Sequence, residues 1–115
     1  MSNQVMVIRA DADARIGFGH VMRCLALAQF WRDEYGAVIF VCQSLAQPLA
    51  KRLRDEKITV LPTRAPIGST ADAAELRAIA IDSAAAAVVL DGYEFGSGFQ
   101  KQLRGGNYTT VIVDD

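Results

Sequence analysis

The sequence has little of several residue types that mark specialised protein classes. Its 115 residues include two cysteines, one histidine, one tryptophan and three prolines. Cys24 and Cys42 lie far apart and form no CxxC pair. Because nothing in the sequence points to export, we expect two reduced thiols in the core rather than a disulfide.

The sequence also lacks an excess of either charge and lacks long hydrophobic runs. Twelve basic residues stand against 13 acidic ones, for a net charge of −1, and the two kinds are interspersed. A nucleic-acid-binding domain would show a basic stripe instead. The apolar run at 5–8 stops at Arg9 and is too short for a signal-peptide core or a membrane span. We therefore expect a cytoplasmic protein that binds neither nucleic acid nor membranes.

The remaining composition and pattern predict one α/β domain over residues 1–115. Hydrophobic residues make up 51% of the chain and charged residues 22%, which is typical of a globular protein. Apolar runs predict strands at 5–10, 37–42, 58–61, 85–90 and 109–113, with a helix after each of the first four. This alternation predicts a Rossmann-like parallel sheet with helices on both faces.

Local residues predict where several helices begin or end. Gly36 is expected to end the first helix. Ser44 is predicted to cap the second, with Pro48 in its first turn. Asp72 followed by Glu75 resembles a capping arrangement at the start of the third.

Three polar clusters follow predicted strands, at 11–20, 91–93 and 114–115. In an open parallel sheet, ligands bind beyond the carboxyl ends of the strands, near the point where the strand order reverses. The first and fourth strands are neighbours there in the usual order. We therefore expect His20 and Tyr93 to face one crevice.

The loop that ends in GFGH is the strongest candidate for chemistry. Gly17 and Gly19 allow the backbone to turn tightly and to approach a ligand. His20 stands at or near a helix start, where free N–H groups favour a phosphate and disfavour an imidazolium. A neutral histidine suits a general base. The alternative is a glycine turn with a histidine that caps or packs. Met22 occupies the third glycine position of a dinucleotide fingerprint, and no Walker A sequence follows.

Other polar residues near this edge have two interpretations each. Asp11, at the tip of the first strand, either orients His20 or holds the loop. Arg23 is either a salt-bridged residue or a phosphate ligand, and Tyr93 is either a rim aromatic or a donor to substrate. The adjacent acids at 114–115 point to opposite faces of a strand, so we expect no metal site.

Two longer stretches carry a resemblance to a known family. IRADA at 8–12 and IGFGHVMRCLALA at 16–28 closely resemble the N-terminus of the pseudaminic acid pathway hydrolases. These enzymes act on UDP-2,4-diacetamido-2,4,6-trideoxy-β-L-altropyranose, and related sequences are named spore coat polysaccharide biosynthesis proteins. VLDGY at 89–93 and IVDD at 112–115 look like later signatures of the same family. The resemblance covers nearly the whole chain.

The resemblance implies a GT-B architecture of two Rossmann-like domains, related to MurG-type glycosyltransferases. This chain would be the N-terminal domain, and the C-terminal nucleotide-binding domain is absent from it. The implied reaction is hydrolysis of the glycosidic C–O bond of a UDP-sugar by water, with inversion and release of UDP, in nonulosonic acid or surface polysaccharide biosynthesis. No metal or cofactor is implied. Without its second domain, the chain is expected to bind UDP-sugar weakly and to turn it over very little.

The resemblance also implies roles for individual residues. His20 matches the histidine proposed to activate water, Tyr93 an active-site tyrosine, and Asp11 the motif acid. The expected substrate-binding residues are the loop beside the diphosphate and two neighbours, namely Gly17, Phe18, Gly19, Arg23 and Asp91.

Two other functions fit the same residues. One is a glycosyltransferase, in which His20 deprotonates a sugar hydroxyl instead of water. The other is a non-catalytic domain that needs a partner chain. Because the chain stops directly after the strand at 109–113, a truncated chain is favoured over a small complete domain. The uncovered edge of that strand predicts self-association.

Overall fold

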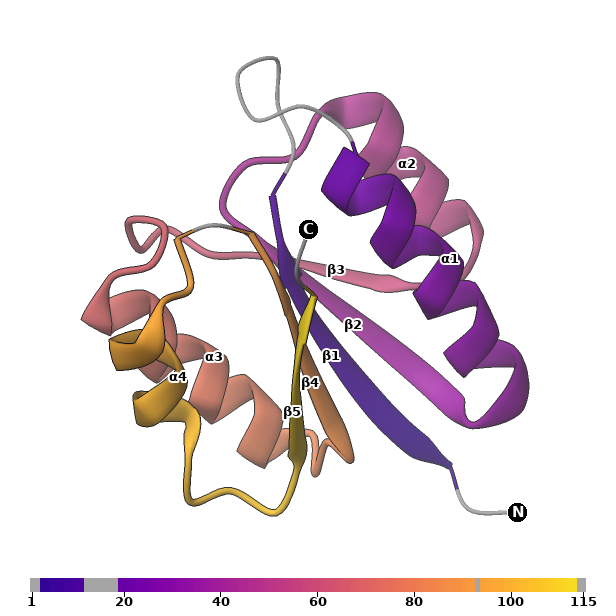
Figure 1. The fold of residues 1–115 in the computed structure, drawn as a ribbon. Helices are drawn as coiled ribbons and strands as arrows, with labels where there is room; N and C mark the ends of the chain where they lie inside the picture. The colour runs from indigo at the N-terminus through magenta and orange to yellow at the C-terminus, as the bar shows by residue number, and fades with distance from the viewer. Residues whose placement is uncertain (1–2, 12–18, 93, 114–115) are drawn as a thin grey trace.

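The computed structural model describes residues 3–11, 19–92 and 94–113, and leaves out the side chains of residues 19–21. Strands and helices alternate along the chain, as predicted. The elements are β1 (Gln4–Ala10), α1 (Gly19–Glu34), β2 (Gly36–Cys42), α2 (Gln47–Asp55), β3 (Thr59–Pro62), α3 (Thr70–Asp82), β4 (Ala87–Asp91), α4 (Ser97–Leu103) and β5 (Thr109–Val113). The strands form one parallel sheet in the order β3-β2-β1-β4-β5 (Figure 1).

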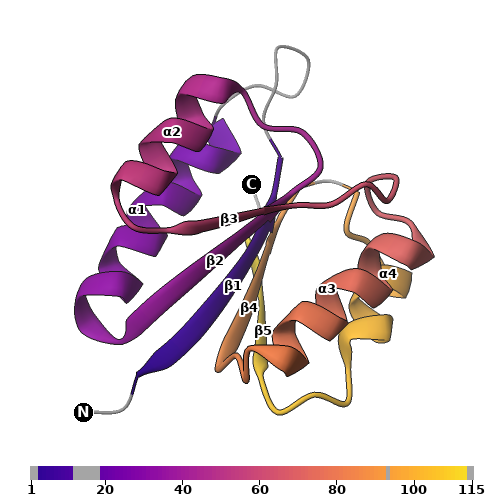
Figure 2. The ribbon, with the colours of Figure 1, turned by 180° about the vertical axis from the view of Figure 1, so that it is seen from behind.

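Helices cover both faces of this sheet. Helices α1 and α2 lie on one face, and α3 and α4 lie on the other (Figures 1 and 2). Each pair closes a separate hydrophobic core, with Phe40 and Leu53 in the first and Leu76 and Phe99 in the second. The prediction of a Rossmann-like α/β fold is therefore confirmed. The order reverses between β1 and β4, which are neighbours as expected.

Strand β1 is buried on both faces, which explains its nearly continuous apolar sequence. Met6 and Ile8 point into the core beneath α1 and α2, and Val7 points into the core beneath α3 and α4. Side chains alternate along a strand, so Arg9 must point to the same face as Val7. The guanidinium is consequently placed inside the protein, under α3.

Gly36 is required where α1 gives way to β2. The helix ends at Glu34, and Gly36 opens the strand with a φ of +152°. A Cβ at this position would lie 2.7 Å from the carbonyl oxygen of Gln4, with which Gly36 is in register. The glycine therefore ends the helix, as predicted, and also lets two strand ends approach closely.

The predicted cap of α2 is wrong. Ala46 is the N-cap and makes no side-chain hydrogen bond there, although Pro48 does occupy the first turn as predicted. Ser44 lies two residues too early to cap. Its backbone N–H instead donates to the Asp11 carboxylate, which keeps this segment against the end of β1.

The cap of α3 also differs from the prediction. Ser69 is the N-cap, and its hydroxyl oxygen accepts a hydrogen bond from the backbone N–H of Asp72 at 3.1 Å. Asp72 is thus in the first turn rather than at the cap. Its side chain is only 1% exposed, because it is turned inward to Arg9.

Strand β5 forms one edge of the sheet, next to β4. Val111 and Ile112 point to opposite faces, yet their exposed fractions are 41% and 42%. Both faces of this strand are therefore incompletely covered within residues 3–113. An exposed edge of β-branched residues is a common site of strand pairing between chains.

Two expectations drawn from composition can also be compared with the structure. Cys24 and Cys42 are both buried and both free thiols, as predicted. No helix among the described residues is long and apolar enough to cross a membrane.

Candidate functional site

The candidate site lies at the carboxyl edge of the sheet, where β1 and β4 end side by side. Ala10 is in register with Asp91, and Asp11 follows directly after β1. Helix α1 begins at Gly19. The first turn of a helix carries unpaired N–H groups and the positive end of its dipole, and both favour an anion.

Asp91, Arg23 and Cys24 form a first group of charged and polar side chains, called the Asp91 cluster below. Arg23 donates from Nη2 to Asp91 Oδ1 at 2.9 Å and from Nε to Oδ2 at 3.3 Å. The Cys24 thiol donates to Oδ2 at 3.3 Å. Asp91 is buried, whereas the Arg23 side chain is 43% exposed. The cluster therefore fixes a cation at the rim of the carboxyl edge.

The Cys24 thiol keeps its proton in this cluster. Burial raises the pKa of Cys24 above its usual range, and the negative charge of Asp91 raises it further. A thiol that stays protonated is a poor nucleophile, because the thiolate is the reactive form. Cys24 therefore acts as a hydrogen-bond donor to Asp91 and is not a candidate for covalent chemistry.

Arg9, Asp11 and Asp72 form a second group, called the Arg9 cluster below. Arg9 donates to both oxygens of Asp72, from Nε at 3.0 Å and from Nη2 at 2.9 Å. Its Nη1 donates to Asp11 Oδ2 at 2.8 Å. Arg9 is fully buried, and its two partners are 5% exposed or less. The two carboxylates surround one guanidinium out of contact with solvent.

The surroundings keep the Arg9 guanidinium charged. Burial acts to lower the pKa of Arg9, but hydrogen bonding to Asp72 and the charges of both carboxylates outweigh it and raise the pKa above its usual value. The Phe95 ring lies beneath the guanidinium, with 5.1 Å between Cζ and the ring centroid. This geometry is typical of a cation–π contact.

Asp11 has more partners than its position at the strand tip indicates. Its Oδ1 accepts hydrogen bonds from the backbone N–H groups of Gln43 at 2.5 Å and Ser44 at 2.8 Å. Its Oδ2 accepts from Arg9. Asp11 therefore holds the loop after β2. Whether it also orients His20 stays a prediction, because the structure does not describe the His20 side chain.

The other predicted site residues divide into two groups. The structure brings Arg23 and Asp91 together in an ion pair, and a role of Arg23 in phosphate binding stays a prediction. His20 lies in the first turn of α1, after Gly19. Three predicted residues lie outside the described residues, namely Gly17, Phe18 and Tyr93.

The sequence pattern predicts no site role for Asp72 or for Arg9. The available signal was one arginine inside an otherwise apolar strand, which requires a buried counter-charge from elsewhere in the chain. Asp72 is 63 residues away, and local spacing does not identify it as the partner.

Within the described residues, no three His, Cys, Asp or Glu side chains are grouped so that they could hold a metal ion. Asp114 and Asp115 lie outside that set.

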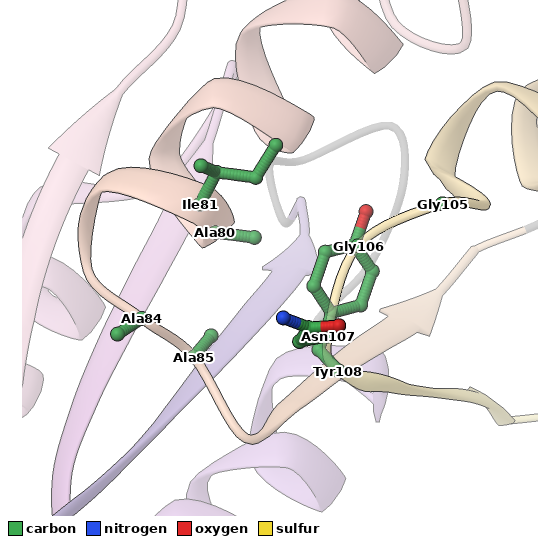
Figure 3. Close-up of a pocket in the computed structure, with 8 residues that line it drawn as sticks. All are labelled: Ala80, Ile81, Ala84, Ala85, Gly105, Gly106, Asn107 and Tyr108. Atoms are coloured by element: carbon green, nitrogen blue, oxygen red, sulfur yellow. The ribbon is translucent and has the colours of Figure 1, made fainter.

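A cavity of about 310 Å³ lies at the other end of the sheet (Figure 3). It is formed by the end of α3 and by the turns that lead into β4 and β5, with Ile81, Ala84, Gly106 and Tyr108 among its lining residues. These turns precede their strands, so the cavity is at the amino edge. None of its lining side chains is charged, and none of its lining residues belongs to the Arg9 cluster or the Asp91 cluster.

Comparisons with known proteins identify the fold. No known protein family matches the sequence, and no curated protein is significantly similar to it. The crystal structure of a glycosyltransferase from Rickettsia africae ESF-5 is similar to this chain, with a TM-score of 0.71 and 11% sequence identity. The match covers 97% of this chain and 30% of the glycosyltransferase.

The chain therefore has a glycosyltransferase-like fold, and it spans less than a third of that structure's length. At this low identity, the likeness concerns the fold alone. It supports the predicted Rossmann-like α/β fold and does not show that the chain belongs to the pseudaminic acid hydrolase family.

Proposed function

We propose that this chain is the N-terminal domain of an enzyme that processes a sugar nucleotide. The observation that carries the proposal is the position of the Asp91 cluster. It places a half-exposed arginine beside the start of α1, at the carboxyl edge between the neighbouring strands β1 and β4. This edge is where open parallel sheets bind their ligands. Arg23 and the helix start are both suited to the negative charge of a diphosphate.

The reaction we propose is hydrolysis of the glycosidic C–O bond of a UDP-sugar. His20, in the first turn of α1, would take a proton from water as the water attacks the anomeric carbon, and UDP would leave with the bonding electrons. A positive helix end disfavours an imidazolium, so it supports a neutral histidine base. Arg23 would stabilise the charge that develops on the departing diphosphate. Asp91 would hold Arg23 in place, and Tyr93 would line the same crevice.

The resemblance of the IRADA and IGFGHVMRC stretches makes the hydrolase the finer proposal. It points to a diacetamido-trideoxy sugar, to nonulosonic acid or surface polysaccharide biosynthesis in the cytoplasm, and to a second domain that binds the nucleotide. The coverage of 30% of the similar glycosyltransferase is in line with a further domain.

A glycosyltransferase is the second candidate. The fold neighbour is itself a glycosyltransferase, which favours this alternative on structural grounds. In that reaction His20 would deprotonate a sugar hydroxyl rather than water. The two reactions differ in one observable respect: only the hydrolase releases UDP without an added acceptor.

UDP release is the test. The longest gene product that contains this chain would be incubated with the diacetamido-altrose nucleotide, as wild type and as His20→Ala. We expect release without an acceptor and a loss of at least a hundredfold in the variant, the usual scale for a general base. Release only when an acceptor is present would establish the transferase. A folded wild type that releases no UDP under either condition would overturn both reactions.

A further inference from the structure

Arg9 contacts residues near the carboxyl ends of β1 and β2, in the first turn of α3 and after β4. Asp11 follows β1, and the carbonyl oxygen of Val41, near the end of β2, accepts from Arg9 Nη1 at 3.4 Å. Asp72 belongs to the first turn of α3, after β3, and Phe95 lies in the connection after β4. One side chain thus joins four parts of the chain at the carboxyl edge.

The two carboxylates extend these contacts to the loop backbone. Asp11 accepts from the backbone N–H groups of Gln43 and Ser44. Asp72 Oδ2 accepts from the N–H of Gly68 at 2.9 Å. Each loop is therefore held by a carboxylate whose own orientation depends on Arg9.

Gly68 shows how closely two of these loops approach each other. Its φ is +77°, and a Cβ there would lie 2.4 Å from the carbonyl oxygen of Glu94. The connection after β3 therefore packs directly on the connection after β4. A displacement of Asp72 would move both connections.

Stability alone is a poor explanation for a buried ion cluster of this kind. Removing two carboxylates and a guanidinium from water carries a large desolvation cost, and apolar residues of similar volume are often as stabilising. The guanidinium supplies rigid, directional donors that an apolar side chain lacks. A guanidinium at this edge is therefore suited to holding the surrounding backbone in one geometry.

We propose that Arg9 is a positioning residue that fixes the connections after β2, β3 and β4 around the sugar-nucleotide site. Its bonds, and those of its two carboxylate partners, hold these loops in one arrangement at the carboxyl edge of the sheet, where the substrate is proposed to bind. This inference rests on the proposed function for its catalytic consequence, but the fixing of the loops can be measured without any substrate.

Amide hydrogen exchange and steady-state kinetics test the proposal together. Arg9→Met removes the donors while keeping the volume, and Arg9→Lys keeps the charge without the bidentate geometry. Arg52→Met is the matched control, since Arg52 carries the same chemistry on the exposed surface of α2. If Arg9→Met does not fold, Asp72→Asn takes its place.

In Arg9→Met we expect the amides of Gln43, Ser44 and Gly68 to exchange at least tenfold faster than in the wild type, while Arg52→Met leaves them unchanged. We expect kcat/KM for UDP release to fall at least tenfold in the folded variant, with partial recovery in Arg9→Lys and no change in Arg52→Met.

Two results would overturn the positioning role. They are unchanged exchange at the three loop amides, and faster loop exchange with unchanged kcat/KM. An inactive wild type would instead overturn the proposed function, and the exchange pattern would then decide alone whether Arg9 fixes the loops.

Discussion

Two arginines at the same edge of the sheet differ in one decisive respect. Arg9 and Arg23 each form two hydrogen bonds to one aspartate, Arg9 on the α3 face and Arg23 on the α1 face. Arg9 is fully buried, whereas Arg23 is 43% exposed. The buried cation can only organise the protein around it. The half-exposed cation can also meet a ligand, so exposure separates residues that share the same chemistry.

The largest expected effect comes from neutralising the aspartate in each cluster. Asp72→Asn leaves a buried guanidinium with one carboxylate, and we expect a loss of about 3–5 kcal/mol in the free energy of unfolding. Asp91→Asn leaves Arg23 able to turn to water, so the expected loss is only about 1–2 kcal/mol. Urea unfolding measures both. Equal losses of unfolding free energy in the two variants would show that the buried and the half-exposed arginine do not differ in their need for a carboxylate partner.

A second prediction concerns pH, because each cluster has a cysteine beside it. Burial and the nearby charge of Asp11 raise the pKa of Cys42 from 9.0 to about 11. Between these values an unfolded thiol loses its proton while the folded one keeps it, so rising pH favours unfolding. We expect Cys42 to account for a loss of about 2–3 kcal/mol between pH 9 and 11.

Urea unfolding of wild type and Cys42→Ala across this range would check the pH prediction. The variant should lose stability less steeply than the wild type as the pH rises. Parallel slopes for the two proteins would show that Cys42 does not keep its proton in the folded state.

The affinity for UDP tests whether the half-exposed Arg23 meets a ligand. Because Arg23 stands at the rim, Arg23→Gln should weaken UDP binding about tenfold, which corresponds to about 1.4 kcal/mol. Titration of the enzyme with UDP measures the affinity. Arg104→Gln, an exposed arginine at the end of α4, is the control and should bind as the wild type does. A similar loss of UDP affinity in both variants would mean that the net charge of the protein, and not the position of Arg23, determines the affinity.

The smallest effect on stability is expected at the β5 edge, which takes part in neither cluster. A lysine at Val111 should change the free energy of unfolding by less than about 0.5 kcal/mol. It should nevertheless reduce self-association, because a charge on an edge strand opposes pairing with another chain. Equilibrium sedimentation compares the two proteins. A wild type that is monomeric at high concentration would show that this edge does not associate.

The fold could be predicted from the sequence because its signals are local. Apolar runs located all five strands, and the alternation with helices determined the layers. The cap of α2 was predicted wrongly, since the backbone N–H of Ser44 is bonded to Asp11, which follows β1. Local sequence rules do not include a partner more than 30 residues away.

The site was predictable only in part, for the same reason. The motif located Arg23 and Asp91 near one edge, and the structure pairs them. The Arg9 cluster joins β1 to α3, and its partner Asp72 resembled an ordinary helix-start residue. Long-range pairing of buried charges is decided by the tertiary arrangement.

The 63-residue separation of Arg9 and Asp72 has a consequence for how the chain folds. In a partly folded state with β1, β2 and β3 assembled but without α3, the face of β1 that carries Arg9 would be open to water, and Arg9 would lack Asp72 as its partner. Such a state also leaves Val7 and Val41, which pack in the core beneath α3 and α4, exposed to water. The first half of the sheet therefore gains little by forming early, and the two halves should form together in one cooperative transition.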